Sequence, residues 1–223
     1  HNIPGHVLGA DIALIKAVGG TTDIAVAPAG VAGAAGTLQD PIHINDLNDK
    51  IAGRSGLNIV FRGGEHIYTT SSEHWEIRID GDNNTFDAYQ DEKVIISGTD
   101  RTPTATTSAG WGAGGLRIKG NGNLWQRMSV ANMPLIGIRV EGNNNTFQAM
   151  QVYKCFGSGV AFFDNTTPNT HLGQGGSHNI IRHSYLYLNS GADVVDHPDY
   201  PGRYNDGGNS DGSGASKGTV GNI

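Results

Sequence analysis

Three stretches decide the fold: Asn123-Leu-Trp125 with Val130, Asn145-Thr-Phe147 with Val152, and Asn179-Ile-Ile181 with Leu186. In each, an asparagine is followed two positions later by an aromatic residue or isoleucine, and an aliphatic residue comes five positions after that. A weaker copy begins at Asn84 with Phe86, and a further one begins at Asn222. Such a repeat is typical of architectures in which one structural unit stacks on the next.

A second marker has the same period. Gly137-Ile-Arg-Val140 is followed 22 residues later by Gly159-Val-Ala-Phe162, and Asn123 and Asn145 are also 22 residues apart. Short strands with Gly and Asn corners at this period predict an all-β fold, a parallel β-solenoid with one coil per repeat. We expect the corner asparagines to bond to their equivalents one coil away, and Trp125, Phe147 and Ile181 to stack inside.

The longer intervals between later copies indicate insertions at Asp164–Ser177 and about Gly191–Gly208. Insertions in solenoids gather on one face and often build the binding site, so we expect them there.

The N-terminal third is organised differently. Ala25–Gly36 is rich in Ala and Gly, which predicts a loop, and Ile44, Leu47 and Ile51 have helical spacing. An amphipathic helix over Pro41–Ile51 would cap the open end of the solenoid. Strands are predicted at Leu57–Phe61, Glu76–Ile79 and Lys93–Ser97. We therefore expect an N-terminal extension over 1–22 and one β-solenoid domain over 23–223.

Composition excludes several classes of protein. Fifteen Lys and Arg against 21 Asp and Glu give a net charge of −6 without a basic cluster, so a nucleic-acid partner is disfavoured. Apolar runs are too short for a membrane span, so no membrane partner is expected. The single cysteine, Cys155, excludes an internal disulfide, and its apolar neighbours predict a buried structural thiol.

Several segments resemble a known family. Asp23-Ile-Ala-Val-Ala-Pro28, Gly36-Thr-Leu-Gln-Asp-Pro41 and Phe61-Arg-Gly-Gly64 resemble the opening of secreted right-handed parallel β-helix polysaccharide lyases. Asn209-Ser-Asp-Gly-Ser-Gly-Ala-Ser-Lys217 is similar to the Asn-Ala-Asp-Gly-Phe-Ala-Ala-Lys segment of the family 9 pectate lyases. The resemblance implies a right-handed parallel β-helix and a secreted, extracellular enzyme.

The resemblance also implies a metal site. The family's aspartate in this segment is a calcium ligand, which carries over to Asp211. Lys217 is six residues from Asp211 rather than five, which a bulge at Gly214 would absorb. The family's further calcium ligands and its catalytic lysine lie in later coils that do not follow here. We therefore expect the chain to be one fragment, completed by a second chain or fragment.

Uronate lyase chemistry needs clustered carboxylates, a basic side chain and a groove. Calcium neutralises the substrate carboxylate, and a Lys or Arg removes the C5 proton. Oxygen ligands suit this hard cation. The candidate residues fall in three groups: metal ligands Asp206, Asn209 and Asp211; catalytic side chains Lys217 and Arg203; and substrate-binding side chains Arg203, Tyr200, Tyr204 and His197.

The leading hypothesis is a calcium-dependent polysaccharide lyase that cleaves an acidic, uronate-containing polymer of the pectate or rhamnogalacturonan type by β-elimination. Two alternatives stay open. A β-helix glycoside hydrolase or uronate epimerase would give products without the unsaturated bond. A non-catalytic β-solenoid adhesin or carbohydrate-binding protein would bind the polymer without turnover.

Overall fold

The structure is a computed structural model of the chain. It describes residues 21–68, 77–98, 114–133, 136–155, 158–162, 176–187, 189 and 219–220. Nearly all of the expected N-terminal extension, both long insertions and the last copy of the repeat at Asn222 lie outside these residues, apart from the final residues 176–177 of the first insertion.

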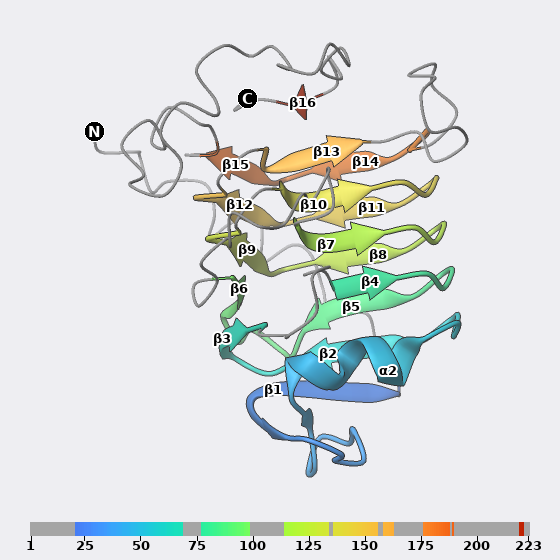
Figure 1. Cartoon of the computed structure of the whole chain (residues 1–223), viewed down its shortest axis with the longest axis vertical. Coiled ribbons are helices and arrows are strands. Elements are labelled where there is room, and N and C mark those ends of the chain that lie inside the picture. The colour runs from blue at the N-terminus through green and yellow to red at the C-terminus, as the bar shows by residue number, and fades with distance from the viewer. Residues whose placement is uncertain are drawn as a thin grey trace, which may run out of the picture.

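The described part is a right-handed parallel β-helix, as the sequence predicts. From β2 onward, each coil contributes one strand to each of three sheets, and successive coils stack along the long axis of the molecule (Figure 1). We call the sheets A, B and C in the order in which the chain visits them.

Within each sheet, neighbouring strands follow one another in chain order. Sheet A contains β1 (Ile24–Val31), β2 (Asn58–Phe61), β5 (Thr85–Ala88), β8 (Leu124–Gln126), β11 (Thr146–Gln148) and β14 (Ile180–Arg182). Sheet B contains β3 (Gly64–Ile67), β6 (Val94–Ser97), β9 (Ser129–Ala131), β12 (Gln151–Tyr153) and β15 (Tyr185–Tyr187). Sheet C contains β4 (Ile77–Ile79), β7 (Gly114–Ile118), β10 (Ile136–Val140), β13 (Val160–Phe162) and β16 (Thr219–Val220).

The register of the strands confirms the predicted repeat. Phe147 pairs with Trp125 on one side and with Ile181 on the other, and Val152 pairs with Val130 and Leu186. In sheet C, Ile138 and Val160 are partners, so the two markers with the 22-residue period stack coil on coil.

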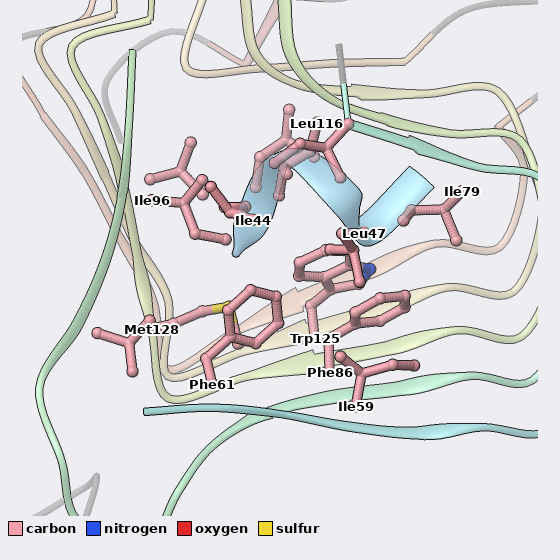
Figure 2. Packing of buried hydrophobic residues seen from close by; sticks show 14 of the residues in the cluster. Ile44, Leu47, Ile59, Phe61, Ile79, Phe86, Ile96, Leu116, Trp125 and Met128 are labelled. Carbon is pink, nitrogen blue, oxygen red and sulfur yellow. The ribbon is translucent and has the colours of Figure 1, made fainter. Parts of the chain in front are cut away.

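The core is the column of side chains that point inward from the three sheets (Figure 2). The rings of Phe86 and Trp125 stack with centroids 3.9 Å apart and an interplanar angle of 7°. Trp125 and Phe86 are fully buried, and Phe147 is 1% exposed. Trp125 is therefore part of the interior stack, as expected from the sequence. Cys155 is buried as predicted, and burial raises the pKa of its thiol to about 12.

A row of asparagines lines the corner before sheet A, and we call it the inner corner row. The backbone N–H of Asn84 donates to Oδ1 of Asn123, that of Asn123 to Asn145, and that of Asn145 to Asn179, at 2.8–2.9 Å. These bonds confirm the predicted contact between equivalent asparagines. The residue directly before an asparagine of this row adopts the left-handed backbone conformation, as at Asn83 (φ 56°) and Asn144 (φ 58°).

A second row, the outer corner row, runs along the same corner nearer to solvent. The N–H of Asn121 donates to Oδ1 of Asp82 at 2.7 Å, that of Asn143 to Asn121 at 2.9 Å, and that of Ser177 to Asn143 at 2.9 Å. Here each donor points to the preceding coil, whereas in the inner corner row each donor points to the following coil.

Glycine is required in the same corner because successive backbones approach closely. A Cβ at Gly120 would overlap the carbonyl oxygen of Gly81, and one at Gly142 would overlap that of Gly120. A side chain there would push two coils apart, which explains why glycine occupies the start of this corner in successive coils.

The N-terminal end differs in part from the prediction. A 3-10 turn (Ile44–Asp46) and helix α2 (Leu47–Ile51) form the predicted cap, with Ile44, Leu47 and Ile51 buried. The helix starts later than Pro41 because Ile42 forms parallel bridges with β1.

The predicted loop over Ala25–Gly36 is wrong for its first half. Strand β1 occupies most of that segment, because Ile24 and Val26 pair with Ile59 and Phe61 of β2 and pack into the core. β1 is an edge strand, where Pro28 is tolerated.

The three other predicted early strands are confirmed as β2, β4 and β6. Sheet C ends differently from the others. Strand β16 pairs with β13 in antiparallel orientation, whereas all other neighbouring strands of the three sheets are parallel.

Candidate functional site

The site residues predicted from the sequence lie outside the described residues. They are Tyr200, Arg203, Tyr204, Asp206, Asn209, Asp211, Lys217 and His197. Their roles as metal ligands, catalytic groups and substrate contacts therefore stay predictions. Within the described ranges, no group of three or more His, Cys, Asp or Glu side chains could hold a metal ion.

The described residues contain a different candidate, the outer face of sheet C. Arg78, Arg117 and Arg139 are direct neighbours in the register of β4, β7 and β10. Each arginine lies between two buried aliphatic residues of its strand, for example Leu116 and Ile118. Because side chains alternate along a strand, the three guanidinium groups stand on the outer face, one coil apart. We call them the arginine row.

A second row of charges flanks the arginine row where the strands end. Asp80, Lys119 and Glu141 each follow their arginine by two residues, so they lie on the same face. The backbone supports their equivalence: Lys119 N–H donates to Ile79 O and Glu141 N–H to Ile118 O, both at 2.8 Å.

Glu141 joins two coils. One of its carboxylate oxygens lies 2.8 Å from Nε of Arg117 and 2.6 Å from Nε of Arg139, and the other accepts from Nη2 of Arg117 at 3.2 Å. Its side chain is fully buried, whereas the side chains of Arg117 and Arg139 are 20% and 17% exposed. One carboxylate thus offsets part of the charge of two guanidinium groups.

The outer face of sheet C is consequently basic. Among the described residues, its four basic and two acidic side chains leave a local net charge of +2 on a chain whose net charge is −6. Guanidinium groups form forked hydrogen bonds with carboxylates, so this face fits an anionic ligand.

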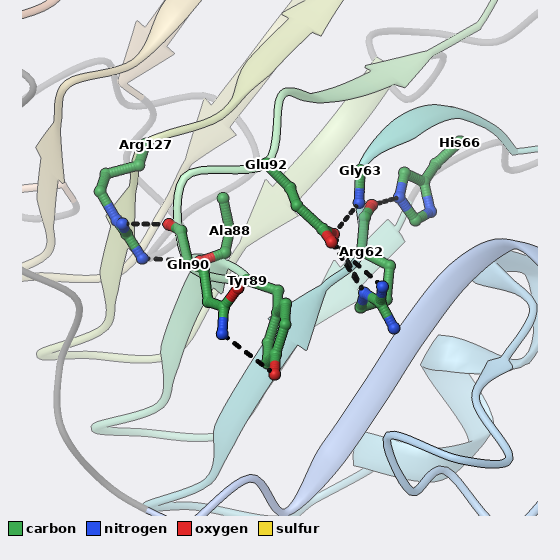
Figure 3. Close-up of polar contacts among 8 residues, drawn as sticks. All are labelled: Arg62, Gly63, His66, Ala88, Tyr89, Gln90, Glu92 and Arg127. Atoms are coloured by element: carbon green, nitrogen blue, oxygen red, sulfur yellow. Dashed lines mark hydrogen bonds and ion pairs between the residues drawn. The ribbon is translucent and has the colours of Figure 1, made fainter.

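Two other polar clusters are structural. At the corner between sheets A and B, Nε of Arg62 lies 3.0 Å from Glu92, its guanidinium lies 4.9 Å from the ring centroid of Tyr89, and Glu92 also accepts from Gly63 N–H (Figure 3). The hydrogen bonds from Arg62 and Gly63 lower the pKa of Glu92. This carboxylate therefore already has two donors and holds the corner together.

The other cluster crosses sheet A. Gln126 donates to Asp87, Gln148 donates to Gln126, and Arg182 donates to Gln148, at 2.5–2.8 Å. Arg127 also contacts Asp87, at 2.7 Å, and donates to backbone carbonyls of Ala88 and Gln90 (Figure 3). These side chains thus form a continuous series of hydrogen bonds that crosses four coils, from β5 to β14.

The arginine row was not anticipated from the sequence, although a signal is present. Ile77-Arg-Ile79, Leu116-Arg-Ile118 and Ile138-Arg-Val140 place an arginine between two aliphatic residues three times. A residue of this type in the middle of a half-buried strand faces solvent, and its recurrence in stacked coils produces a row.

No helix among the described residues has the length and apolar character needed to cross a membrane.

Comparisons with known proteins agree on the fold. No protein-family model and no curated protein matches the sequence. Among solved structures, the chain is similar to pectate lyase Pel9A, with a TM-score of 0.56 and 18% identity over 76% of this chain and 41% of that one. It is similar to a rhamnogalacturonan lyase with a TM-score of 0.56 and 13% identity, over 76% of this chain and 52% of that one. The chain thus spans about half the length of these proteins or less, and its fold is the parallel β-helix found in these polysaccharide lyases.

Proposed function

We propose that the protein is a polysaccharide lyase that binds a uronate-containing polymer on the outer face of sheet C and cleaves it by β-elimination. The observation that carries the proposal is the basic face made by the arginine row and Lys119. Its fold, which it has in common with two polysaccharide lyases, supports the same assignment. Pectate and rhamnogalacturonan are the first substrates to test.

The chemistry needs positive charge near the substrate carboxylate. Removal of the C5 proton places an electron pair beside the carboxylate. The electrons then form the C4–C5 double bond as the C4–O bond breaks, and the leaving oxygen takes a proton. Cationic side chains that contact the carboxylate stabilise the charge that develops on it. Among the described residues, the arginine row can bind and orient the carboxylates of the polymer.

Calcium dependence, secretion and the proton-abstracting residue are further parts of the proposal. Bound calcium would supply added neutralisation of the substrate carboxylate. Asp206, Asn209 and Asp211 remain the proposed ligands and Lys217 or Arg203 the proposed base, all outside the described residues. The described part offers no metal cluster, and the binding role of sheet C does not depend on one.

The test is direct. The full chain is incubated with polygalacturonate, with rhamnogalacturonan and with a neutral galactan, and the ultraviolet absorbance of the new C4–C5 double bond is followed with and without added calcium or a chelator. We expect product from an acidic polymer and none from galactan. Binding of the acidic polymers without unsaturated product would favour a carbohydrate-binding protein and overturn the lyase assignment. Shortened chains without the double bond would favour a hydrolase.

A further inference from the structure

Lys119 occupies a position that carries an acid in the two adjacent coils. Asp80, Lys119 and Glu141 are equivalent residues after β4, β7 and β10, so the charges alternate along the solenoid as acid, base and acid. In the first and third coils the acid pairs with the arginine two residues before it, at 2.9 Å for Arg78 and 2.6 Å for Arg139.

The middle coil cannot make that pair. Arg117 is followed by Lys119, and its acid is Glu141 of the next coil, which is already shared with Arg139. Lys119 itself takes part in no ion pair within the part of the chain that the structure describes. The coil that contains β7 therefore carries two cations on one face, and Glu141, which pairs with Arg117, belongs to the next coil.

Lys119 lies between two acids of the adjacent coils, but both acids are already engaged by arginines: Asp80 by Arg78, and Glu141 by Arg117 and Arg139. The ammonium group of Lys119 therefore keeps its capacity to pair with a carboxylate from outside the chain.

We infer that Lys119 binds one carboxylate of the anionic polymer, in the place that the Asp80 and Glu141 carboxylates define in the adjacent coils. The inference rests on the proposed function and refines it. Arg117 lies on the same face, held by Glu141, and adds to the positive field. A lysine suits the role because its ammonium is a point charge on a flexible stem and can follow the ligand.

The experiment compares Lys119→Glu with Lys93→Glu in the full chain. Both substitutions change the net charge equally, but Lys93 is an exposed residue just before β6, in sheet B. Affinity for polygalacturonate is measured by calorimetry at two salt concentrations, after circular dichroism has established that both variants are folded. Lys119→Gln and Lys119→Arg are measured alongside.

We expect Lys119→Glu to bind at least about tenfold more weakly, Lys119→Gln to be intermediate, Lys119→Arg to retain binding, and Lys93→Glu to stay within about twofold of the wild type. Fully methyl-esterified pectin, which lacks the charge, should not distinguish the wild type from Lys119→Glu. Equal losses in Lys119→Glu and Lys93→Glu would overturn the role of Lys119 while leaving the proposed function standing. No wild-type binding to polygalacturonate or rhamnogalacturonan, or tighter binding to a DNA duplex than to either, would overturn both.

Discussion

The inner corner row and the outer face of sheet C are built from the same coils, but they repeat differently. The corner keeps asparagine at 84, 123, 145 and 179, and three equivalent bonds join these four residues. The outer face keeps arginine at 78, 117 and 139 and then changes the charge of the flanking residue from acid to base and back. In the inner corner row each position must both donate and accept in a buried setting, so the residue type stays the same. The positions that flank the arginine row do not bond to one another, so their charges can differ, and a deviation from the pattern there points to a ligand.

The largest effect is expected inside the column. Trp125→Ala removes the ring that stacks on Phe86 and leaves a cavity between three coils, so it should lower the free energy of unfolding by about 3–5 kcal/mol. Urea denaturation followed by circular dichroism measures the loss. Trp125→Phe keeps an aromatic ring and should lose clearly less; equal losses would contradict the role of the stack.

A pH dependence is expected from the polar residue in the same column. His66 of β3 is fully buried and pairs with Ile96 of β6 in the register of sheet B. Burial lowers the pKa of the His66 imidazole to about 4 from an ordinary value of about 6.5. Between these two pKa values the unfolded chain binds more protons than the folded one. The free energy of unfolding is therefore highest above pH 6.5 and falls as the pH drops towards 4. The total loss is about 3 kcal/mol. Urea titrations from pH 7 to pH 4 measure it.

His66→Leu is the matched variant for this pH dependence, because leucine cannot take up the proton. The variant should lack most of the loss. An unchanged pH profile in His66→Leu would assign the effect to other groups.

The two corner rows separate buried from exposed hydrogen bonds. Asn145→Ala leaves the buried N–H of Asn123 without an acceptor, which should cost about 1–3 kcal/mol. Asn143→Ala removes an equivalent acceptor in the outer corner row, where water replaces it, and should cost less than about 1 kcal/mol. Thermal unfolding of both variants tests the difference, and a costlier Asn143→Ala would contradict it.

The smallest effect on stability is expected on the outer face of sheet C. Lys119→Gln removes a half-buried cation that forms no described ion pair, so the free energy of unfolding should change by no more than about 0.5 kcal/mol. A loss above about 1 kcal/mol in urea denaturation would show that Lys119 supports the fold, and the comparison between corner and face would fail.

The sequence predicts those elements whose residues recur at a fixed spacing along the chain. Asn145 and Phe147 recur at a fixed period, and a period is visible without coordinates. Strand β1 was missed because its pairing partner, β2, lies 35 residues away in the register of Ile24 and Ile59, and the Ala- and Gly-rich segment carries no local signal strong enough to show it.

The site is predicted less well, for a physical reason. Asp211 and Lys217 were identified by resemblance, which says nothing of what lies beside them, and they lie outside the described residues. The link between Glu141 and Arg117 joins residues 24 positions apart. Only the register of sheet C brings these side chains together. The charge of that face therefore becomes visible only when the coils are placed on one another.

The opposite donor directions of the two corner rows bear on how such a chain can change in length. A block of 22 residues inserted between two coils would present an inner acceptor and an outer donor to the preceding coil. To the following coil it would present an inner donor and an outer acceptor. Both chains of hydrogen bonds would close again without a gap. The solenoid can therefore grow or shrink by whole turns at little cost in bonding, whereas a duplication of half a turn would break both at once.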